Sequence, residues 1–395
     1  MTKTLLQDVC VFIVDCPHST AQDQGEGYPL IRTPNIGKGR LILEGVHRVS
    51  ESVYKQRIAR GVPQDGDLIF AREAPAGNVA IVKNGDKVCL GQRTVLLRPN
   101  KEKVVPEYLV YYLLAPQQQY GLLGTANGAT VAHVNLPTIR ELPIELPPMD
   151  IQRRIADILS AYDDLIENNQ KQIKLLEEAA QRLYREWFVE LRFPGHETTP
   201  VVDGVPEGWE RTTFGAICSL RKETLTPERI PEGIPYIGLE HMPRRSICLS
   251  EWGDSGDVNS NKFMYYENDV LFGKIRPYFH KVGFALNSGV ASTDSIVMIA
   301  KDGVWGLLLT TASSDAFVDY TYQNCKEGAK MPRADWSTMQ KYKVLIAEES
   351  VQQRFEAQIR AIADRIKSLA MQNRLLAEAR DRLLPKLMSG EMEVC

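Results

Sequence analysis

Two stretches of the chain carry apolar residues at alternating steps of four and three positions. The first extends from Ile155 to Trp187 and the second from Phe355 to Leu387. This spacing is the heptad seam of a coiled coil. Together with the aligned residues that precede them, IQRR at Ile151 and VQQR at Val351, each segment runs about 37 residues. Each helix would therefore be roughly 55 Å long, far above the usual length of a globular helix. Because a lone helix of this kind would leave its seam in water, the pattern predicts that the two helices pair with each other.

One asparagine interrupts each seam near its middle. Asn169 comes just before the midpoint of the first helix, and Asn373 comes just after the midpoint of the second. Antiparallel pairing about these midpoints would bring both amides into one layer, and a buried Asn pair fixes the register of a coiled coil at some cost in stability. The sequence therefore predicts that Asn169 and Asn373 set the register of a spacer. The alternative is that each faces solvent at a loose point of its seam.

The heptad stretches belong to a longer repeat. LLEEAAQRL starts at Leu175 and LLAEARDRL starts at Leu375, an offset of 375 − 175 = 200 residues. Upstream, GATVAHVNL at Gly128 aligns with GAKMPRADW at Gly328 at the same offset. The rest of the two blocks is less alike, which indicates two related domains that share a scaffold and differ in their loops.

The blocks that precede the heptad stretches contain short β-rich runs such as DLIF, NVAIV and DSIVMIA, separated by Gly, Pro and Asn. The sequence therefore predicts an α+β fold, in which two pseudo-repeated domains are joined by two long antiparallel helices that form a coiled coil. The expected order is a first variable domain, a central long helix, a linker, a second variable domain and a C-terminal long helix. These segments cover residues 1–149, 150–190, 191–205, 206–348 and 349–395, respectively.

Composition narrows the class of protein. Hydrophobic residues make up 44% and charged residues 25% of the 395 residues, as is ordinary for a folded globular protein. No apolar window is long enough to span a membrane. The apolar start, flanked by Asp8 and Asp15, reads as a buried strand rather than a signal peptide, so we expect a cytoplasmic protein. The seven cysteines contain no C-x-x-C pair, which favours reduced thiols over a metal site.

Several catalytic motifs are missing from the sequence. No G-x-x-x-x-G-K-[ST] loop for nucleoside triphosphates occurs, since Gly273-Lys274 is followed by Ile275. PPMD at Pro147 is not the Asn/Asp-Pro-Pro-aromatic motif with which an adenine methyltransferase holds a flipped base. The six histidines lack the H-x-x-x-H spacing of a zinc site. The sequence thus predicts a non-catalytic chain with neither a metal nor a cofactor of its own.

Three further segments accompany the repeat: LPIELPPMDIQRRI at Leu142, LYREWFVELRFPG at Leu183 and PEGW at Pro206. In this ordered combination the chain resembles the specificity subunit of type I restriction–modification systems over essentially its whole length. The resemblance implies that each variable domain is a target-recognition domain for one half of an asymmetric, bipartite DNA site, and that the paired helices set the spacing.

The resemblance also implies partners. Two methyltransferase (modification) subunits would methylate adenine in double-stranded DNA, and motor/nuclease (restriction) subunits would join them for cleavage. S-adenosylmethionine, ATP and Mg²⁺ would be bound by those partner subunits and not by this chain.

Polar side chains beside the predicted strands are candidates for DNA contacts, because loops on a rigid scaffold can present donors and acceptors to base edges. In the first domain the candidates are Arg72, Asn78, Arg93, Asn127, Thr130 and His133. In the second domain they are Lys274, Arg276, Tyr278, His280 and Lys281, together with Lys330 and Arg333 at the repeat positions of Thr130 and His133. The alternative interpretation is that the aromatic residues are core and the basic residues are merely solvated strand ends.

The formal net charge of −3 argues mildly against nucleic-acid binding unless positive charge is concentrated locally. A coiled-coil scaffold without nucleic-acid binding therefore stays an alternative, although it does not explain why two like domains carry different loop residues. An enzyme with an unrecognised site is a third alternative, which the missing motifs weigh against. A DNA reader predicts binding that falls steeply with salt, whereas a scaffold predicts partner binding without DNA.

Overall fold

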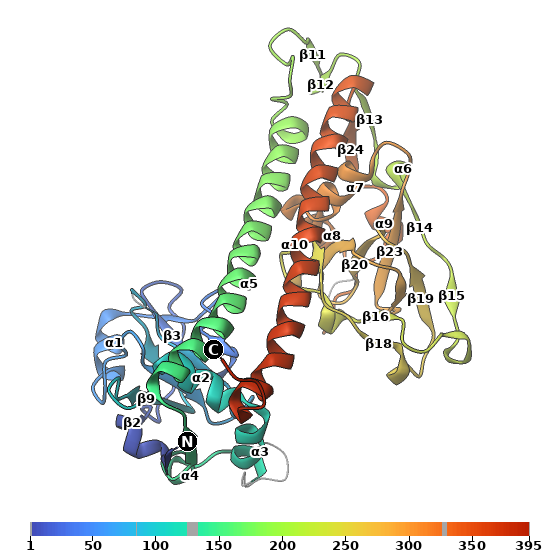
Figure 1. The fold of residues 1–395 in the computed structure, drawn as a ribbon. Coiled ribbons are helices and arrows are strands. Elements are labelled where there is room, and N and C mark those ends of the chain that lie inside the picture. Colours follow the sequence, from blue (N-terminus) through green and yellow to red (C-terminus); the bar gives the residue numbers. More distant parts are fainter. Residues whose placement is uncertain (1, 84, 125–132, 326–329, 395) are drawn as a thin grey trace. The chain divides into compact units, whose positions relative to one another are not determined.

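The computed structural model describes residues 2–83, 85–124, 133–325 and 330–394 (Figure 1). The chain forms two compact units. Unit 1 consists of residues 1–165 and 376–395, and unit 2 consists of residues 166–375. Unit 1 combines two stretches of sequence because both long helices pass from one unit into the other. None of the described helices has the length and apolarity needed to cross a membrane.

A five-stranded sheet with the order β2-β9-β6-β7-β4 forms the centre of unit 1. Its neighbouring strands pair antiparallel, except that β7 and β4 are parallel. A three-stranded sheet, β5-β3-β8, and a β1-β10 pair complete the strands. Their bounds are β1 (Thr2–Leu5), β2 (Cys10–Asp15), β3 (Tyr28–Ile31), β4 (Gly39–Arg40), β5 (Arg48–Val49), β6 (Leu68–Ala71), β7 (Val79–Ile81), β8 (Cys89–Leu90), β9 (Thr94–Pro99) and β10 (Pro143–Leu146).

The core of unit 1 lies on both faces of its central sheet. All four residues of β6 are buried. Leu68 and Phe70 pack into one cluster with α2, whereas Ile69 and Ala71 pack into another. Because successive side chains of a strand point to opposite faces, an uninterrupted apolar run such as LIFA indicates a strand that is covered on both sides. The short helices of this unit are α1 (Glu51–Arg57), α2 (Pro106–Leu114), α3 (Pro116–Gly124) and α4 (Leu136–Arg140).

Unit 2 contains a central sheet with the order β14-β23-β20-β21-β17. Its single parallel pair is β21 with β17, so strand order and pairing directions match those of the central sheet in unit 1. A second sheet, β15-β19-β22-β16-β18, and the pairs β13-β24 and β11-β12 complete the strands. Their bounds are β11 (Val201–Val202), β12 (Val205–Pro206), β13 (Glu210–Thr213), β14 (Cys218–Leu220), β15 (Thr224–Leu225), β16 (Pro235–Ile237), β17 (Cys248–Leu249), β18 (Gly253–Asp254), β19 (Lys262–Tyr265), β20 (Val270–Gly273), β21 (Val282–Ala285), β22 (Gly289–Ala291), β23 (Ser295–Ala300) and β24 (Lys343–Ile346).

The core of unit 2 is organised in the same way around β20, all of whose residues are buried. Val270 and Phe272 face one cluster and Leu271 faces another. The Ser314 hydroxyl caps the start of α8 by accepting a hydrogen bond from the Phe317 amide at 3.2 Å. The short helices are α6 (Phe214–Ile217), α7 (Trp305–Ala312), α8 (Asp315–Gln323) and α9 (Trp336–Met339).

The two heptad stretches are helical. The first corresponds to α5 (Met149–Tyr184), which is followed by a π-helical turn (Arg185–Val189). The second corresponds to α10 (Glu349–Ser389). Mixed α/β content is therefore established, with two helices much longer than any other helix in the described residues.

Contacts between α5 and α10 show how the helices run within unit 2. The Asn169 amide lies 3.5 Å from Gln372 Oε1. Beyond the end of α5, the Phe188 ring lies edge-on to the Phe355 ring, with centroids 4.7 Å apart. Residue numbers rise along one partner while they fall along the other, so the two segments are antiparallel in this unit.

Two segments differ from the expectations drawn from the sequence. The apolar start, expected as one strand, divides into β1 and β2 around a 3₁₀ turn at Leu6–Val9. It divides because β1 pairs with β10 whereas β2 pairs with β9 of the central sheet. The segment expected as a plain linker contains the start of the hairpin β11-β12. It also contains the buried Phe193, whose ring lies 4.6 Å from the Trp209 ring between centroids.

Candidate nucleic-acid interface

Three chain segments meet at one end of the central sheet in unit 1. Arg72 follows β6, Arg93 precedes β9, and His133 lies in the segment that returns before α4. The Arg72 amide donates to the Arg93 carbonyl at 2.9 Å, and the Val134 amide donates to the Arg72 carbonyl at 3.0 Å. These bonds extend the β6-β9 ladder and bring three of the predicted side chains together. We call these three positions frame 1.

The side chains of frame 1 form one hydrogen-bonded network with two acids, Asp15 and Glu73. Arg72 donates to Asp15 at 2.8 Å and contacts His133 Nε2 at 2.9 Å. Because a guanidinium can only donate, Nε2 is the acceptor and His133 Nδ1 carries the proton toward Glu73 Oε1, at 2.5 Å. The other oxygen of Glu73 lies 3.0 Å from Arg93 Nη1. The Arg72 side chain is 12% exposed and that of Arg93 is 59% exposed, so Arg93 is the accessible end of this network.

The corresponding frame of unit 2 uses the same backbone bonds. Lys274 follows β20, Asp294 precedes β23, and Arg333 lies in the segment that returns before α9. The Lys274 amide donates to the Asp294 carbonyl at 2.7 Å, and the Ala334 amide donates to the Lys274 carbonyl at 2.8 Å. These three positions, frame 2, therefore carry a lysine, an acid and an arginine where frame 1 carries two arginines and a histidine.

The predicted basic residues of unit 2 differ in burial and in their hydrogen-bond partners. Lys274 donates from Nζ to the Thr293 carbonyl at 2.7 Å, and burial lowers the pKa of its ammonium group. Lys281 is half-buried and donates to a backbone carbonyl, and burial lowers its pKa as well. Arg333 is 56% exposed and lies 2.9 Å from Asp294 Oδ1. Arg333 is thus the most accessible of these three cations.

The predicted basic–aromatic cluster at residues 273–281 turns sharply. Arg276 and His280 adopt left-handed backbone conformations on either side of the 3₁₀ turn Pro277–Phe279. Tyr278 is exposed and meets the Tyr322 ring edge-on, with centroids 5.2 Å apart. The Arg276 Nε atom is buried with no hydrogen-bond partner among the described residues. The turn therefore presents Tyr278 outward and draws part of Arg276 inward.

His280 lies inside unit 2, with 6% of the residue exposed. Its Nε2 atom lies 2.8 Å from the Ser313 carbonyl, which can only accept, so Nε2 carries the proton. Its Nδ1 atom lies 3.4 Å from Asp315 Oδ1. Burial lowers the pKa of the imidazole below its ordinary value. Both ring nitrogens of His280 therefore lie inside unit 2, so this side chain is not part of the exposed surface.

The remaining predicted contacts have different surroundings. Asn78 is half-buried and donates from Nδ2 to the Ile36 carbonyl at 2.8 Å, which uses its amide inside unit 1. Lys330 is exposed. Asn127 and Thr130 lie outside the described residues.

The predicted register pair lies where α5 and α10 contact each other in unit 2. Asn169 is buried and its amide points to Gln372, the residue before Asn373. The Asn373 Oδ1 atom is buried with no hydrogen-bond partner among the described residues. A direct contact between Asn169 and Asn373 stays a prediction.

The acids of both frames were not singled out from the sequence. Glu73 adjoins Arg72 in the chain, but its partners Arg93 and His133 come 20 and 60 residues later. Asp294 comes 39 residues before Arg333. The sequence does place each of these acids directly beside the end of a predicted strand, among basic residues. This placement indicates an ion pair only when it is known which strands are neighbours.

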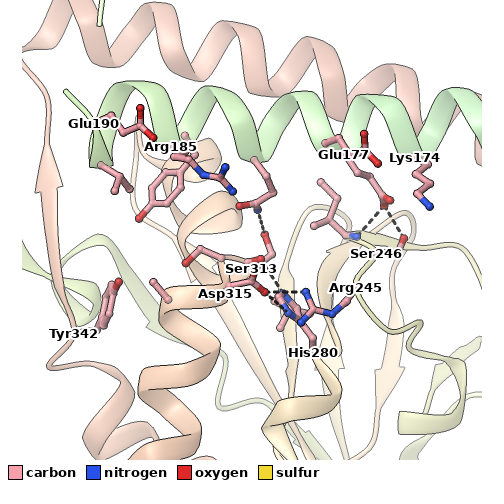
Figure 2. Close-up of a pocket in the computed structure, with 18 residues that line it drawn as sticks. Lys174, Glu177, Arg185, Glu190, Arg245, Ser246, His280, Ser313, Asp315 and Tyr342 are labelled. Atoms are coloured by element: carbon pink, nitrogen blue, oxygen red, sulfur yellow. Dashed lines mark hydrogen bonds and ion pairs between the residues drawn. The ribbon is translucent and has the colours of Figure 1, made fainter. Parts of the chain in front are cut away.

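A cavity of about 520 Å³ lies beside α5 in unit 2 (Figure 2). Glu177 of α5 accepts hydrogen bonds from the Ser246 hydroxyl at 2.6 Å and from the Ile247 amide at 2.9 Å. Arg245 and Asp315 pair at 2.9 Å on another part of the wall. The lining carries both signs of charge, and the hydrogen bonds of Glu177 attach α5 to the domain beside it. Among the described residues, no three His, Cys, Asp or Glu side chains gather as metal ligands.

Comparison with known proteins gives consistent matches. A family model described as "Type I restriction modification DNA specificity domain" matches residues 5–178. The type I restriction enzyme MjaIX specificity subunit of Methanocaldococcus jannaschii is 26% identical over 89% of this chain and 83% of its own length. The HindI specificity subunit of Haemophilus influenzae is 23% identical over 85% of this chain and 88% of its own length.

A solved structure supports the fold. The S subunit of a type I restriction–modification system from M. genitalium superposes with a TM-score of 0.56 at 15% identity. The match covers 98% of this chain and 95% of that chain. At this identity the likeness concerns the fold.

The matched domain and the two curated relatives point to the same class, a DNA-specificity protein. Residues 5–178 match the DNA specificity domain of type I restriction–modification systems, and over most of its length the chain is similar to the specificity subunits of these systems, which supports a role in DNA sequence recognition. The interpretation as a coiled-coil scaffold without nucleic-acid binding is not favoured by these matches.

Proposed function

We propose that the chain carries two target-recognition domains, at residues 1–149 and 206–348, and that each reads one half of an asymmetric, bipartite DNA site. The observation that carries the proposal is the relation between frames 1 and 2. They share their backbone hydrogen bonds at the ends of like-ordered sheets but carry different side chains. Sequence is read by side chains at base edges, so a common scaffold with different side chains suits two unlike half-sites.

We further infer that α5 and α10 act as a spacer that is an antiparallel coiled coil, within residues 150–190 and 349–395, with a linker at residues 191–205. The contacts of Asn169 with Gln372 and of Phe188 with Phe355 support this pairing. A paired helix is stiffer than a Gly/Ser-rich linker, so the separation of the half-sites would contribute to specificity.

The proposal includes the partners on which activity depends. Two methyltransferase subunits would supply S-adenosylmethionine-dependent adenine methylation, and restriction subunits would supply ATP- and Mg²⁺-dependent cleavage. The lack of methyltransferase and nucleotide-binding motifs in this sequence supports that division of labour. We place the complex in the cytoplasm, together with its double-stranded DNA.

The proposal predicts one bipartite methylation motif for this chain. The full chain is produced together with its methyltransferase subunits in a host without adenine methylation, and N6-methyladenine is mapped across the host DNA. We expect a single asymmetric motif with two specified halves, a fixed gap and one methylated adenine in each half. The control omits this chain and retains the methyltransferase subunits. Methylation that persists in the control, or a palindromic motif, would contradict the proposal.

A further inference from the structure

Each frame presents one arginine that is exposed yet held by an acid. Arg93 is 59% exposed and pairs with Glu73, and Arg333 is 56% exposed and pairs with Asp294. The carboxylates are less accessible than the guanidiniums, at 19% for Glu73 and 35% for Asp294. An exposed arginine ordinarily samples many rotamers, and a fixed carboxylate beside it reduces that freedom.

Glu73, the acid beside frame 1, is itself fixed by the interior of unit 1. Glu73 Oε1 accepts a hydrogen bond from His133 Nδ1–H, and His133 Nε2 accepts one from Arg72, which in turn pairs with Asp15. The Arg72 Nε atom also donates to the Val134 carbonyl at 2.9 Å. This relay leaves Glu73 Oε2 pointed at Arg93 and sets the direction of its guanidinium.

In frame 2 the arginine is oriented by fewer residues. Asp294 directly precedes β23, and its carbonyl accepts the Lys274 amide in the sheet ladder. The backbone of Arg333 is held by its β-bridge to Ile275. The acid and the arginine are therefore both attached to the end of the central sheet.

Three other cations near the frames are engaged by the fold. Lys274 bonds to the Thr293 carbonyl, Lys281 bonds to the Leu239 carbonyl, and Arg72 bonds to Asp15 and Val134. Arg93 and Arg333 each contact their acid through Nη1. Because a guanidinium has five N–H donors, donors remain on each of them for a ligand.

We propose that Arg93 and Arg333 each read a guanine in their half of the DNA site, and that Glu73 and Asp294 are positioning residues for them. This inference rests on the proposed function. A planar fork with two free parallel donors matches O6 and N7 of guanine in the major groove. The same fork also fits a phosphate, and the test below separates the two ligands. The inference assigns one specified G·C pair to each half-site.

The test uses the complete complex of this chain with its methyltransferase subunits. Methylation rates are measured in competition on duplexes in which each base pair of the site is varied singly. Arg93→Lys keeps the charge but loses the fork. We expect it to lower discrimination at one G·C pair of one half about ten- to hundredfold and to leave the other half unchanged. Arg333→Lys does the same in the other half. Arg153→Lys, at an exposed position of α5, is the matched control.

The positioning role of Glu73 and Asp294 is tested separately. Glu73→Gln relaxes the same base pair as Arg93→Lys, and the double variant discriminates no worse than Arg93→Lys alone. Asp294→Asn stands in the same relation to Arg333→Lys. A purely structural role for Glu73 would lower the thermal midpoint without selecting that base pair. Arg93→Gln serves if the lysine variant does not fold.

Three results overturn the inference. They are unchanged discrimination in the lysine variants, an equal loss of methylation on every duplex with a shallower salt dependence, and a half-site without a G·C pair. The second result identifies phosphate contacts instead. A wild-type complex that produces no bipartite methylation overturns the proposed function itself, and the inference with it.

Discussion

Buried carboxylates just before the central strands hold arginines within both units. Asp67 precedes β6 and accepts two hydrogen bonds from Arg98, at 2.9 and 2.7 Å. Asp269 precedes β20 and accepts two from Arg221, at 2.6 and 2.9 Å. An unpaired buried carboxylate is strongly unfavourable, so these arginines are tied to the fold. Basic residues near the strands thus divide into those that neutralise buried acids and those that remain accessible at the strand ends.

His280 predicts a pH dependence of stability in unit 2. Its pKa is lowered in the folded protein by burial and by Arg245, although the Ser313 carbonyl, Asp315 and Asp319 act in the opposite direction. The unfolded chain therefore binds a proton near pH 6.5 that the folded chain resists. The resulting stability is present above pH 6.5 and is lost as the pH falls toward the lowered pKa. We expect wild type to lose more stability than His280→Gln between pH 7.5 and 5.5, as measured by urea unfolding. An equal loss in both proteins would contradict the assignment.

The sequence located polar residues at the strand ends better than it predicted the surroundings of each residue. Lys274 and Arg333 were named as candidates, and both stand in frame 2. His280 belongs to the same basic–aromatic run, but left-handed residues turn the chain there and place its ring inside. Such a reversal depends on packing against Ser313 and is not visible in local spacing. Glu73 was not predicted, because its partners Arg93 and His133 become its neighbours only when the strands pair.

At the scale of elements, α5 is fastened to the domain of unit 2 by polar side chains on one of its faces. Glu177 accepts from Ser246 and Ile247, and one turn later Gln181 donates to the Ser313 hydroxyl at 2.8 Å (Figure 2). The apolar seam of the helix faces α10, so the helix uses two faces for two different partners within this unit. The heptad pattern predicts the apolar seam, but it does not predict which polar residues attach the helix to the domain.

Removal of the Glu177 carboxylate should weaken this attachment. Glu177→Ala leaves the Ser246 hydroxyl and the Ile247 amide without their acceptor, which we expect to cost about 1–3 kcal/mol in the free energy of unfolding. Glu178→Ala is the matched control, because Glu178 is the adjacent, exposed residue and its loss should cost less than about 0.5 kcal/mol. Chemical denaturation of the full chain measures both values. Equal losses in the two variants would refute the anchoring role.

The strands were predictable one by one, whereas the order of the sheets was not. The runs DLIF, NVAIV and TVLL overlap β6, β7 and β9, because β-branched and apolar runs favour covered strands. The edge strand β4 has two residues, Gly39–Arg40, and pairs in parallel with β7. No hydrophobic period can be read from two residues, so this edge follows from tertiary contacts. The long helices were the most predictable elements, since many heptads repeat the same signal.

At the scale of the whole molecule, the two halves are related without being interchangeable. In unit 1, Asp163 of α5 pairs with Arg380 of α10 and accepts from the Tyr111 hydroxyl at 2.6 Å. The positions that the 200-residue repeat relates to Asp163 and Arg380 are Ala363 and Ala180, and both are buried in unit 2. An ionic layer in one unit thus corresponds to small apolar residues in the other. Substituting one helix for the other would leave Asp163 opposite an alanine, which disfavours exchange.

If each domain reads its own half of the DNA site, exchanging the loops of one domain should change only one half of the methylated motif. Tyr28–Ser50 and Asp67–His133 are replaced together by the corresponding segments of another specificity subunit, while unit 2 and both long helices are kept. If each domain reads its own half, the methylated motif changes in one half and retains its other half and its gap, because frame 2 and the spacer are untouched. Methylome mapping of the chimaera with the original methyltransferase subunits measures the motif. The reciprocal exchange within residues 206–348 is the control and should alter the opposite half. Changes in both halves from a single exchange would show that the domains read DNA jointly, and the one-domain, one-half assignment would then be wrong.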